Sequence, residues 1–378
     1  MWYEPFLQFS AGMVVFWMLV LALAVQLFYY LYFFLRLARF KSAEGINELP
    51  PVSVVICARN EDDNLVAFLP IVLAQDYPEF QVVVVNDCSF DNTEDILKEF
   101  SERHPHLKVV TIKEDEYYSH GKKVALMMGI KGARYEHLLL TDADCRPASD
   151  QWLRSMAAQF TTETEIVLGY GPYEKRSGLL NKLIRFDAFF IALQYLSFSM
   201  ARITYMGVGR NLAYRKELFF RHKGFASHYH IQSGDDDLFV NQAATRRNTR
   251  VEVRPDSFTL SVPERTFKAW WRQKRRHLTT GKRYKFGHKL LLITYVASQW
   301  LFFGTFISAL VLNFQPYVVL GIMLLRLLLQ MLIFKKAMEK LGERDLLLLV
   351  PFVEIFLLFF YPALTFAGIF QRRRKWMT

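Results

Sequence analysis

The sequence predicts an α/β domain with a Rossmann-like mixed sheet, flanked by transmembrane helices and by amphipathic helices at the membrane surface. Between residues 48 and 288, apolar strand-like runs alternate with helix-like segments, as in parallel sheets joined by crossover helices. Long uncharged apolar segments lie on both sides of this region, and 52% of the 378 residues are hydrophobic. Soluble chains contain fewer, so much of the chain is expected to face lipid.

The first apolar segment, residues 11–35, contains no charge and only Gln26 as a strongly polar side chain. It is long enough to cross a hydrocarbon core of about 30 Å. A cleavable signal peptide would be shorter and would start with basic residues. Basic residues instead follow the segment, at Arg36, Arg39 and Lys41. We expect residues 1–40 to form an uncleaved anchor, with its N-terminus outside the cell membrane and the following domain in the cytosol.

Residues 289–370 contain three further apolar segments, at roughly 290–313, 316–334 and 346–370. Arg326 lies in the second and Glu354 in the third. Charges at membrane depth face other helices or water, so these two side chains either pair with each other or each reach the interface.

The basic tail, residues 371–378, makes the number of crossings ambiguous. If all three later apolar segments cross the membrane, as we expect, this tail lies outside, against the positive-inside tendency. The alternative is a re-entrant last segment, because Pro351 and Pro362 can break its helix.

Residues 48–288 form one soluble domain whose first half is the most regular part. The expected strands are 52–58, 80–85, 108–112 and 137–140, and the expected helices are 64–74, 92–100 and 122–132. The strands are nearly continuous apolar runs, typical of strands buried on both faces. The three cysteines are scattered through this domain, which indicates reduced thiols in the cytosol.

Acidic residues follow two of these strands, where open α/β sheets bind ligands. Asp142 and Asp144 are two positions apart, so their side chains point the same way if the strand stays extended. Carboxylate oxygens suit Mg²⁺ or Mn²⁺, and such an ion can neutralise a nucleotide diphosphate as a Lewis acid. The alternative is a solvated acidic pair. Asp87 ends another strand, where it either meets a nucleotide or forms an Asx turn.

Several motifs in a fixed order resemble the family 2 glycosyltransferases of GT-A fold. They are Ser53–Glu61 (SVVICARNE), Asn86–Ser89, Gly121-Lys122, Asp142-Ala143-Asp144, Gly234–Asp237 and Gln273–His277. The resemblance covers about residues 50–285 and is greatest to the membrane-embedded branch, which includes cellulose, chitin and hyaluronan synthases and ceramide glucosyltransferases. It implies an inverting hexosyltransferase with a nucleotide-sugar donor.

The resemblance also implies a role for each matching residue. It places Asp144 on the metal, with Asp142 helping on metal or ribose, and it assigns donor binding to Asp87, Glu61, Lys122, Asp142, Gln273 and Arg276. Asp236 matches the catalytic base, which removes a proton from the acceptor hydroxyl. Leu238 follows one residue sooner than in many family members, so Asp235 is the alternative base. Glu61 could equally be a helix-start acid.

His277 stands where the family's Gln-x-x-Arg-Trp motif has Trp. A Trp ring lets a long glycan stack and stay bound, whereas imidazole is smaller and more polar. We therefore expect His277 on the acceptor side, and one or very few sugars added per encounter.

Two segments are expected to lie in the membrane plane. Residues 266–288 combine Trp270 and Trp271 with many basic residues, as in interfacial helices. Residues 178–206 are apolar but interrupted by charges, which argues against a crossing and favours amphipathic helices that roof the acceptor path.

The net charge of +11 does not require a nucleic-acid partner, because the basic residues cluster beside apolar segments and no recognition module is present. Anionic membrane lipids and a nucleotide-sugar donor, expected to be UDP-linked, explain the charge. The expected acceptor is a lipid or lipid-linked glycan. The alternatives are a processive polysaccharide synthase that extrudes its polymer, or a transporter or scaffold without transferase activity. The sugar, the linkage and the oligomeric state are left open by the sequence.

Overall fold

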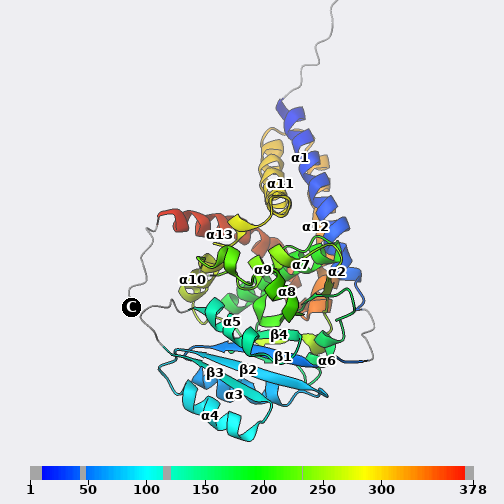
Figure 1. Cartoon of the computed structure of the whole chain (residues 1–378). Helices are drawn as coiled ribbons and strands as arrows, with labels where there is room; N and C mark the ends of the chain where they lie inside the picture. Colours follow the sequence, from blue (N-terminus) through cyan, green and yellow to red (C-terminus); the bar gives the residue numbers. More distant parts are fainter. Residues whose placement is uncertain (1–10, 43–47, 114–120, 232, 371–378) are drawn as a thin grey trace, which may run out of the picture.

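The structure is a computed structural model that describes residues 11–42, 48–113, 121–231 and 233–370. An α/β domain lies at one end, and long apolar helices project from it (Figure 1). The predicted basic tail, residues 371–378, lies outside the described residues, as do the first ten residues of the predicted anchor.

A seven-stranded mixed sheet forms the centre of the domain, with strand order β3-β2-β1-β4-β7-β6-β8. Its strands are β1 (Val52–Ala58), β2 (Phe80–Asp87), β3 (Leu107–Ile112), β4 (His137–Asp142), β6 (Ile166–Leu168), β7 (Leu212–Arg215) and β8 (Thr249–Val251). The first four are mutually parallel, and β7 is antiparallel to both β4 and β6. A second, antiparallel sheet pairs β5 (Cys145–Pro147) with β9 (Thr259–Ser261).

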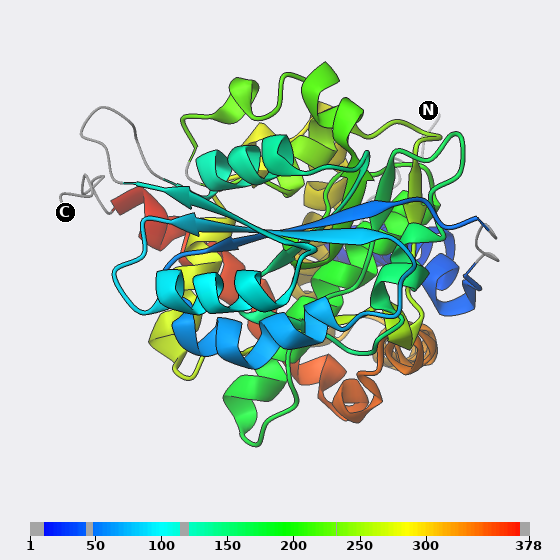
Figure 2. The ribbon, with the colours of Figure 1, turned by 60° about the horizontal axis from the view of Figure 1, so that its bottom comes forward.

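Helices cover both faces of the main sheet. In Figure 2, α3 (Asp62–Leu73) and α4 (Thr93–Arg103) lie on one face, and α5 (Lys122–Gly132) lies on the other. Successive residues of β1 and β2 face opposite sides, so one set packs into the α3 and α4 core and the other into the core shared with the long helices. Burial on both faces explains why these strands are almost entirely apolar.

The predicted elements of the first half are confirmed to within a few residues, and the predicted mixed sheet and reduced thiols are also found. The sequence did not indicate the second half of the sheet. There, β6, β7 and β8 have three or four residues each, too few to show a periodic pattern. Shorter helices complete this half: α6 (Trp152–Ala157), α8 (Lys216–Arg221), α9 (Asp237–Ala243) and α10 (Phe267–His277).

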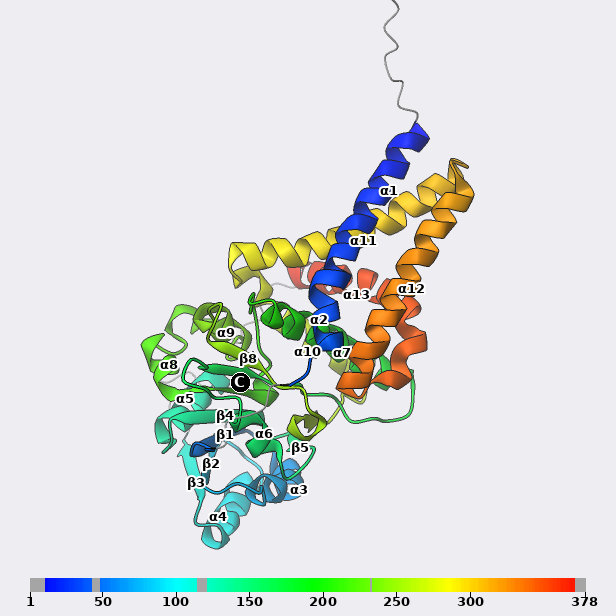
Figure 3. The ribbon, with the colours of Figure 1, turned by 90° about the vertical axis from the view of Figure 1, so that its right-hand side faces the viewer.

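Among the residues that the structure describes, five helices are long and apolar enough to cross a membrane by length and composition. They are α1 (Ala11–Phe28) with its continuation through a π-helical turn into α2 (Leu35–Arg39), α7 (Leu179–Met200), α11 (Phe286–Val311), α12 (Pro316–Leu341), and α13 (Val350–Phe370) with the 3₁₀ turns before it. Figures 1 and 3 show α1, the second half of α11 and α12 extending together away from the sheet. In both views α13 runs across this direction, and it packs against α7, α10 and α11.

The charged pair within the apolar helices is confirmed. The Arg326 guanidinium on α12 lies 2.5 Å from the Glu354 carboxylate on α13, and both side chains are buried. Gln26 accepts a 2.5 Å hydrogen bond from Arg326, and Gln299 donates a 2.7 Å bond to Glu354. This network joins α1, α11, α12 and α13, so the charges serve helix packing.

Helix α7 lies in the segment predicted to form amphipathic helices in the membrane plane, and it is more enclosed by protein than such a helix would be. Most of it is buried, and Arg185 and Asp187 are almost fully enclosed. Arg185 pairs with Glu343 at 2.5 Å and with Asp345 at 2.7 Å in the connection between α12 and α13. The charges of α7 therefore tie the α/β domain to the long helices, while its placement at the membrane plane stays a prediction.

Candidate active site

The predicted acidic residues meet at the carboxyl edge of the parallel strands. Asp142 ends β4, and Asp144 follows in the tight connection to β5. One ligand atom from each of Asp142, Asp144 and Cys145 lies within 4.8 Å of the others. The Cys145 thiol is buried and contacts Ser261 Oγ at 3.0 Å, so it belongs to the small sheet that shapes this edge.

The electrostatics of this edge fit a divalent cation bound through oxygen. Burial and the neighbouring Asp142 raise the pKa of Asp144, because two carboxylates close together oppose each other's ionisation. Burial also acts to raise the pKa of Asp142, but the Lys122 ammonium outweighs it and lowers that pKa. Two close carboxylates offer oxygen ligands of the kind that Mg²⁺ or Mn²⁺ accepts.

Lys122 connects two motifs that are far apart in the sequence. It stands at the start of α5, after Gly121, and its ammonium lies 2.7 Å from Asp142 and 3.3 Å from Asp235. Burial acts to lower the pKa of Lys122, but Asp142 and Asp235 hold it well above its usual value. Lys122 is therefore charged, and it fixes the 234–237 segment against β4.

Asp87 and Glu61 lie at the same edge, after β2 and β1. Asp87 is buried at the end of its strand. Glu61 precedes α3, accepts a 2.6 Å hydrogen bond from Asn64, and has its pKa raised by burial and by the nearby Asp144 and Asp142. Glu61 therefore stands at a helix start and close to the acidic pair, and its role in donor binding stays a prediction.

The three aspartates of the 234–237 segment have different surroundings. Asp235 is buried beside Lys122. Asp237 is buried and accepts hydrogen bonds from Tyr284, at 2.7 Å, and from Thr280. Asp236 is partly exposed, and its oxygens accept only backbone N–H bonds among the described residues, from Gly209 and Asp237, both at 2.7 Å. Asp236 is thus the member of the triplet with no side-chain partner in that set.

Burial and the adjacent Asp235 and Asp237 raise the pKa of Asp236 to about 7. The Lys122 charge and the backbone N–H bond from Gly209 lower the pKa of Asp236 but do not cancel the shift. A carboxylate with a pKa near neutrality is a much stronger base than an ordinary aspartate and still ionises at physiological pH.

The comparisons with known proteins agree with this geometry. Residues 53–221 match the family model described as "Glycosyl transferase family 2". This matched segment, which runs from β1 to α8, is therefore similar to glycosyl transferase family 2. A Bacillus subtilis protein named "Probable glycosyltransferase YdaM" is 28% identical over 256 residues, covering 62% of this chain and 56% of that protein. The "Poly-beta-1,6-N-acetyl-D-glucosamine synthase" of Staphylococcus epidermidis is 37% identical over 93 residues, covering 25% and 21%.

A solved structure of a mannosyltransferase from Pyrobaculum calidifontis has the same fold. Its TM-score is 0.58 with 20% sequence identity, and the alignment covers 89% of this chain and 96% of that one. Its title describes a complex with GDP-Man and Mn²⁺. The chain spans about half the length of the first curated relative and a fifth of the second. The family match ends at residue 221, before the Asp236 and Gln273 motifs.

Helix α10 contains the Gln273–His277 motif, and the side chains of this motif have different surroundings. Gln273 accepts a long 3.5 Å hydrogen bond from Tyr173. Lys274 points the other way and forms a buried ion pair with Asp187 of α7, which also accepts a bond from Tyr361 of α13. Arg276 and His277 are exposed. The ion pair thus fixes α10 between the domain and the apolar helices.

His277 is expected to be neutral at physiological pH. Crowding by the surrounding protein and the cations Lys274 and Arg276 lower its pKa below the usual value, although the ring keeps an accessible surface.

Arg210 is a site residue that sequence reasoning missed. Its guanidinium lies 4.4 Å from the centroid of the Tyr173 ring, and its positive charge stabilises the ionised forms of Asp142 and Asp144. It follows Gly209, whose N–H binds Asp236. A single arginine in a short Gly-Val-Gly-Arg-Asn connection carries no periodic or motif signal, so only the fold shows its position.

Proposed function

We propose that this protein is a membrane-bound, metal-dependent, inverting glycosyltransferase. Its donor is a nucleotide-sugar, expected to be UDP-linked, and its acceptor is a lipid or a lipid-linked glycan. One observation carries the proposal: Lys122 bridges Asp142 of the acidic pair and Asp235 of the 234–237 segment. Donor-side and acceptor-side carboxylates are thereby held at one edge of the sheet, as a direct transfer between two substrates requires.

On the donor side, Asp142 and Asp144 would hold Mg²⁺ or Mn²⁺, which when bound neutralises the diphosphate as a Lewis acid. Asp87 and Glu61 line the part of the edge where the base and ribose would lie, and Lys122 adds a fixed positive charge. Arg276 has an exposed guanidinium suited to a bidentate contact with the departing diphosphate. Gln273 and Arg210 both contact Tyr173 and add further polar groups to the proposed donor site.

On the acceptor side, Asp236 is the proposed base. Its carboxylate takes the proton of the acceptor hydroxyl while that oxygen forms a bond to the anomeric carbon. The bond from this carbon to the diphosphate breaks, and its electron pair leaves with the nucleoside diphosphate. Attack on the face opposite the leaving group inverts the anomeric centre. The raised pKa of Asp236 and its accessible surface support this role over Asp235.

The charge distribution supports a cytosolic active site with three membrane crossings. Each of the three projecting helices has basic residues at the end near the sheet: Arg36 and Arg39 after α1, Lys285 and Lys289 at the start of α11, and Lys335, Lys336 and Lys340 near the end of α12. The connection between α11 and α12, at the far end, has no charged residue. Basic residues are typically retained in the cytosol.

Helix α13 is proposed to lie near the membrane plane without crossing. It runs across the projecting helices, and its Tyr361 hydroxyl contacts Asp187 next to α10. The tail, residues 371–378, then stays cytosolic, which removes the conflict with the positive-inside tendency. Of the two topologies left open by the sequence, these features support the one with a non-crossing last segment.

Addition of one or a few sugars is proposed because the neutral His277 ring offers less stacking surface than Trp. Processive synthesis is the second candidate, because the Staphylococcus epidermidis relative is named for a polymer.

The test is to incubate the purified protein with labelled nucleotide-sugars and candidate lipids, with Mg²⁺, with Mn²⁺ or with EDTA. We expect metal-dependent label in a discrete lipid product. A ladder of long chains would favour the synthase, and no hydrolysis or transfer with any donor would favour a transporter or scaffold.

A further inference from the structure

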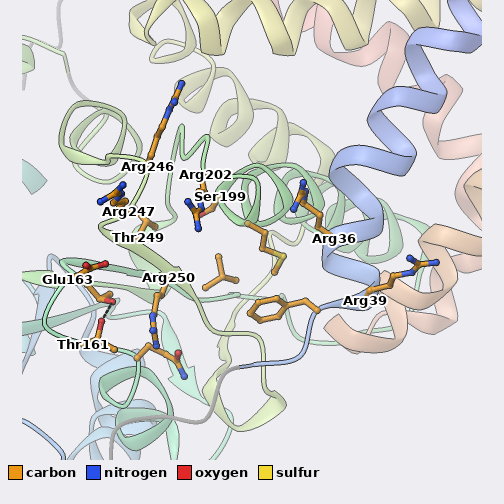
Figure 4. A pocket seen from close by; sticks show the side chains of 15 residues that line it. Arg36, Arg39, Thr161, Glu163, Ser199, Arg202, Arg246, Arg247, Thr249 and Arg250 are labelled. Atoms are coloured by element: carbon orange, nitrogen blue, oxygen red, sulfur yellow. Dashed lines mark hydrogen bonds between the residues drawn. The ribbon is translucent and has the colours of Figure 1, made fainter.

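A cavity of about 770 Å³ lies away from the active site, between α2, the end of α7 and the β8 edge of the sheet. Figure 4 shows the side chains that line it, and they come from four separate segments of the chain. Six arginines line it: Arg36, Arg39, Arg202, Arg246, Arg247 and Arg250. Its volume is in the range of cavities that bind small ligands.

The strand register places this cavity at the opposite end of the sheet from the proposed active site. The catalytic edge is at the carboxyl end of β4, and there Leu140 pairs with Leu212 at the start of β7. The same Leu212 pairs with Leu168 at the carboxyl end of β6, because β6 and β7 are antiparallel. The cavity is lined by residues around the amino ends of β6 and β8. It is therefore separate from the proposed donor site.

The positive charge of the cavity is largely uncompensated. Glu163 is the one acidic residue in its lining. Among the residues that the structure describes, no carboxylate lies within ion-pair distance of any of the six guanidinium groups. Arg36 instead donates to the Tyr32 carbonyl and stacks on the Tyr32 ring. Clustered like charges repel one another, so a bound anion would stabilise the cluster.

Two local structures hold arginines at the cavity. Asn248 clamps the turn that carries Arg246 and Arg247, because its Oδ1 accepts from Thr245 N at 2.7 Å and its Nδ2 donates to Glu165 at 2.8 Å. Arg202 ends α7 in the left-handed region, with φ of 62°, where glycine is usual. The backbone thus adopts an unfavourable conformation at a residue whose side chain lines the cavity.

The cavity lies at the level expected for lipid headgroups. The exposed residues of α1 and the π-helical turn are large and apolar up to Tyr32. Residues 11–32 span about 33 Å at the helical rise, which matches the thickness of a hydrocarbon core. Arg36 and Arg39 come within the next two turns, so their guanidinium groups are at the cytosolic surface of the bilayer in the proposed topology.

We infer that this arginine-lined cavity binds the phosphate-bearing headgroup of an anionic membrane lipid. Guanidinium groups recognise phosphate oxygens by paired hydrogen bonds, and several of them can share one headgroup. The headgroup would link α2 to the β8 edge and so fix the orientation of the sheet domain on the membrane. Inorganic phosphate offers the same chemistry, but the position beside α1 favours the lipid.

The test compares soluble short-chain lipids by their effect on thermal unfolding of the full-length protein in detergent. Dioctanoyl phosphatidylglycerol is expected to raise the unfolding midpoint in a saturable, salt-sensitive way. Dioctanoyl phosphatidylcholine and inorganic phosphate at equal concentration are expected to have little effect. Each basic residue near an anionic membrane changes the binding affinity about fivefold. In the variant with Arg246→Gln and Arg247→Gln, the phosphatidylglycerol concentration that gives half of the shift should therefore rise about thirtyfold.

The matched control is Lys98→Gln with Arg103→Gln, which removes two exposed charges from α4 at the far side of the domain. It should keep the full phosphatidylglycerol effect. The Arg246 and Arg247 substitutions leave the Asn248 clamp intact, so the lipid-free midpoint should be unchanged. The inference is overturned if the Arg246/Arg247 variant responds like the control, if phosphatidylcholine acts equally, or if inorganic phosphate alone gives the same shift.

Discussion

The Lys122 ammonium lies 3.3 Å from the Asp235 carboxylate, although the two residues are far apart in the sequence. Asp235 is buried, and Lys122 provides a counter-charge beside its carboxylate. Because Lys122 also lies 2.7 Å from Asp142, a single side chain holds the proposed base segment in register with the proposed metal site.

Lys122→Gln is expected to lower kcat/KM for transfer by about a hundredfold or more, because a buried carboxylate loses its partner and the donor loses a fixed charge. Lys122→Arg keeps the charge and should recover part of the activity. The control is Lys131→Gln, an exposed lysine on the same helix, measured in the same assay. Equal activity of Lys122→Gln and Lys131→Gln would contradict the bridging role.

Asp144→Ala is expected to abolish transfer and the metal dependence of nucleotide binding, because the ion would lose one of its two carboxylates. Binding of a labelled nucleoside diphosphate with and without Mn²⁺ measures this directly. Asp150→Ala removes an exposed carboxylate from a nearby turn and should behave like the unchanged protein. Full activity of the unchanged protein in EDTA would argue against a metal.

Asp236→Asn should leave donor binding nearly unchanged and reduce turnover by at least about a hundredfold, the usual scale for a lost general base. Since the pKa of Asp236 is raised to about 7, its basic form increases with pH. The turnover of the unchanged protein should therefore rise as pH increases through about 7 and should fall below it. If Asp235→Asn is inactive while Asp236→Asn works, the base is one residue earlier.

Asp187→Asn is expected to destabilise the protein and to reduce activity, although Asp187 lies in α7 and outside the proposed site. The substitution leaves Lys274 buried without a counter-charge, which typically costs about 3 to 5 kcal/mol. Thermal unfolding of Asp187→Asn, Lys274→Met and the double variant measures the coupling. The double variant should be more stable than Asp187→Asn alone, and strict additivity would show that the pair is not coupled.

A single cysteine placed after Lys375, with Cys57, Cys88 and Cys145 replaced, reports the side of the tail. We expect labelling only from the cytosol, because α13 runs across the projecting helices. A cysteine placed at Asn313, between α11 and α12, should be labelled from outside and provides the control. Access to both positions from outside would support a crossing by α13.

Much of the fold is encoded in short stretches of sequence. The strands β1 and β2 are recognisable as continuous apolar runs because both faces of the sheet are buried. The helices between the first four strands are recognisable from the helical spacing of their apolar residues. The same holds for the long apolar helices, whose composition reflects contact with lipid. The acidic motifs could be recognised as site candidates because ligand-binding residues follow the carboxyl ends of parallel strands.

The sequence by itself determined the family, the α/β class, the apolar helices and the candidate site residues. Only the tertiary structure decided which aspartate of the triplet lacks a side-chain partner and where Arg210 lies. It also decided that Arg326 pairs with Glu354 and that α13 runs across the direction of the projecting helices. The physical reason is that ion pairs, burial and pKa shifts depend on groups brought together by the folded chain from distant positions. Lys122 and Asp235, or Lys274 and Asp187, show no local pattern that would reveal the contact.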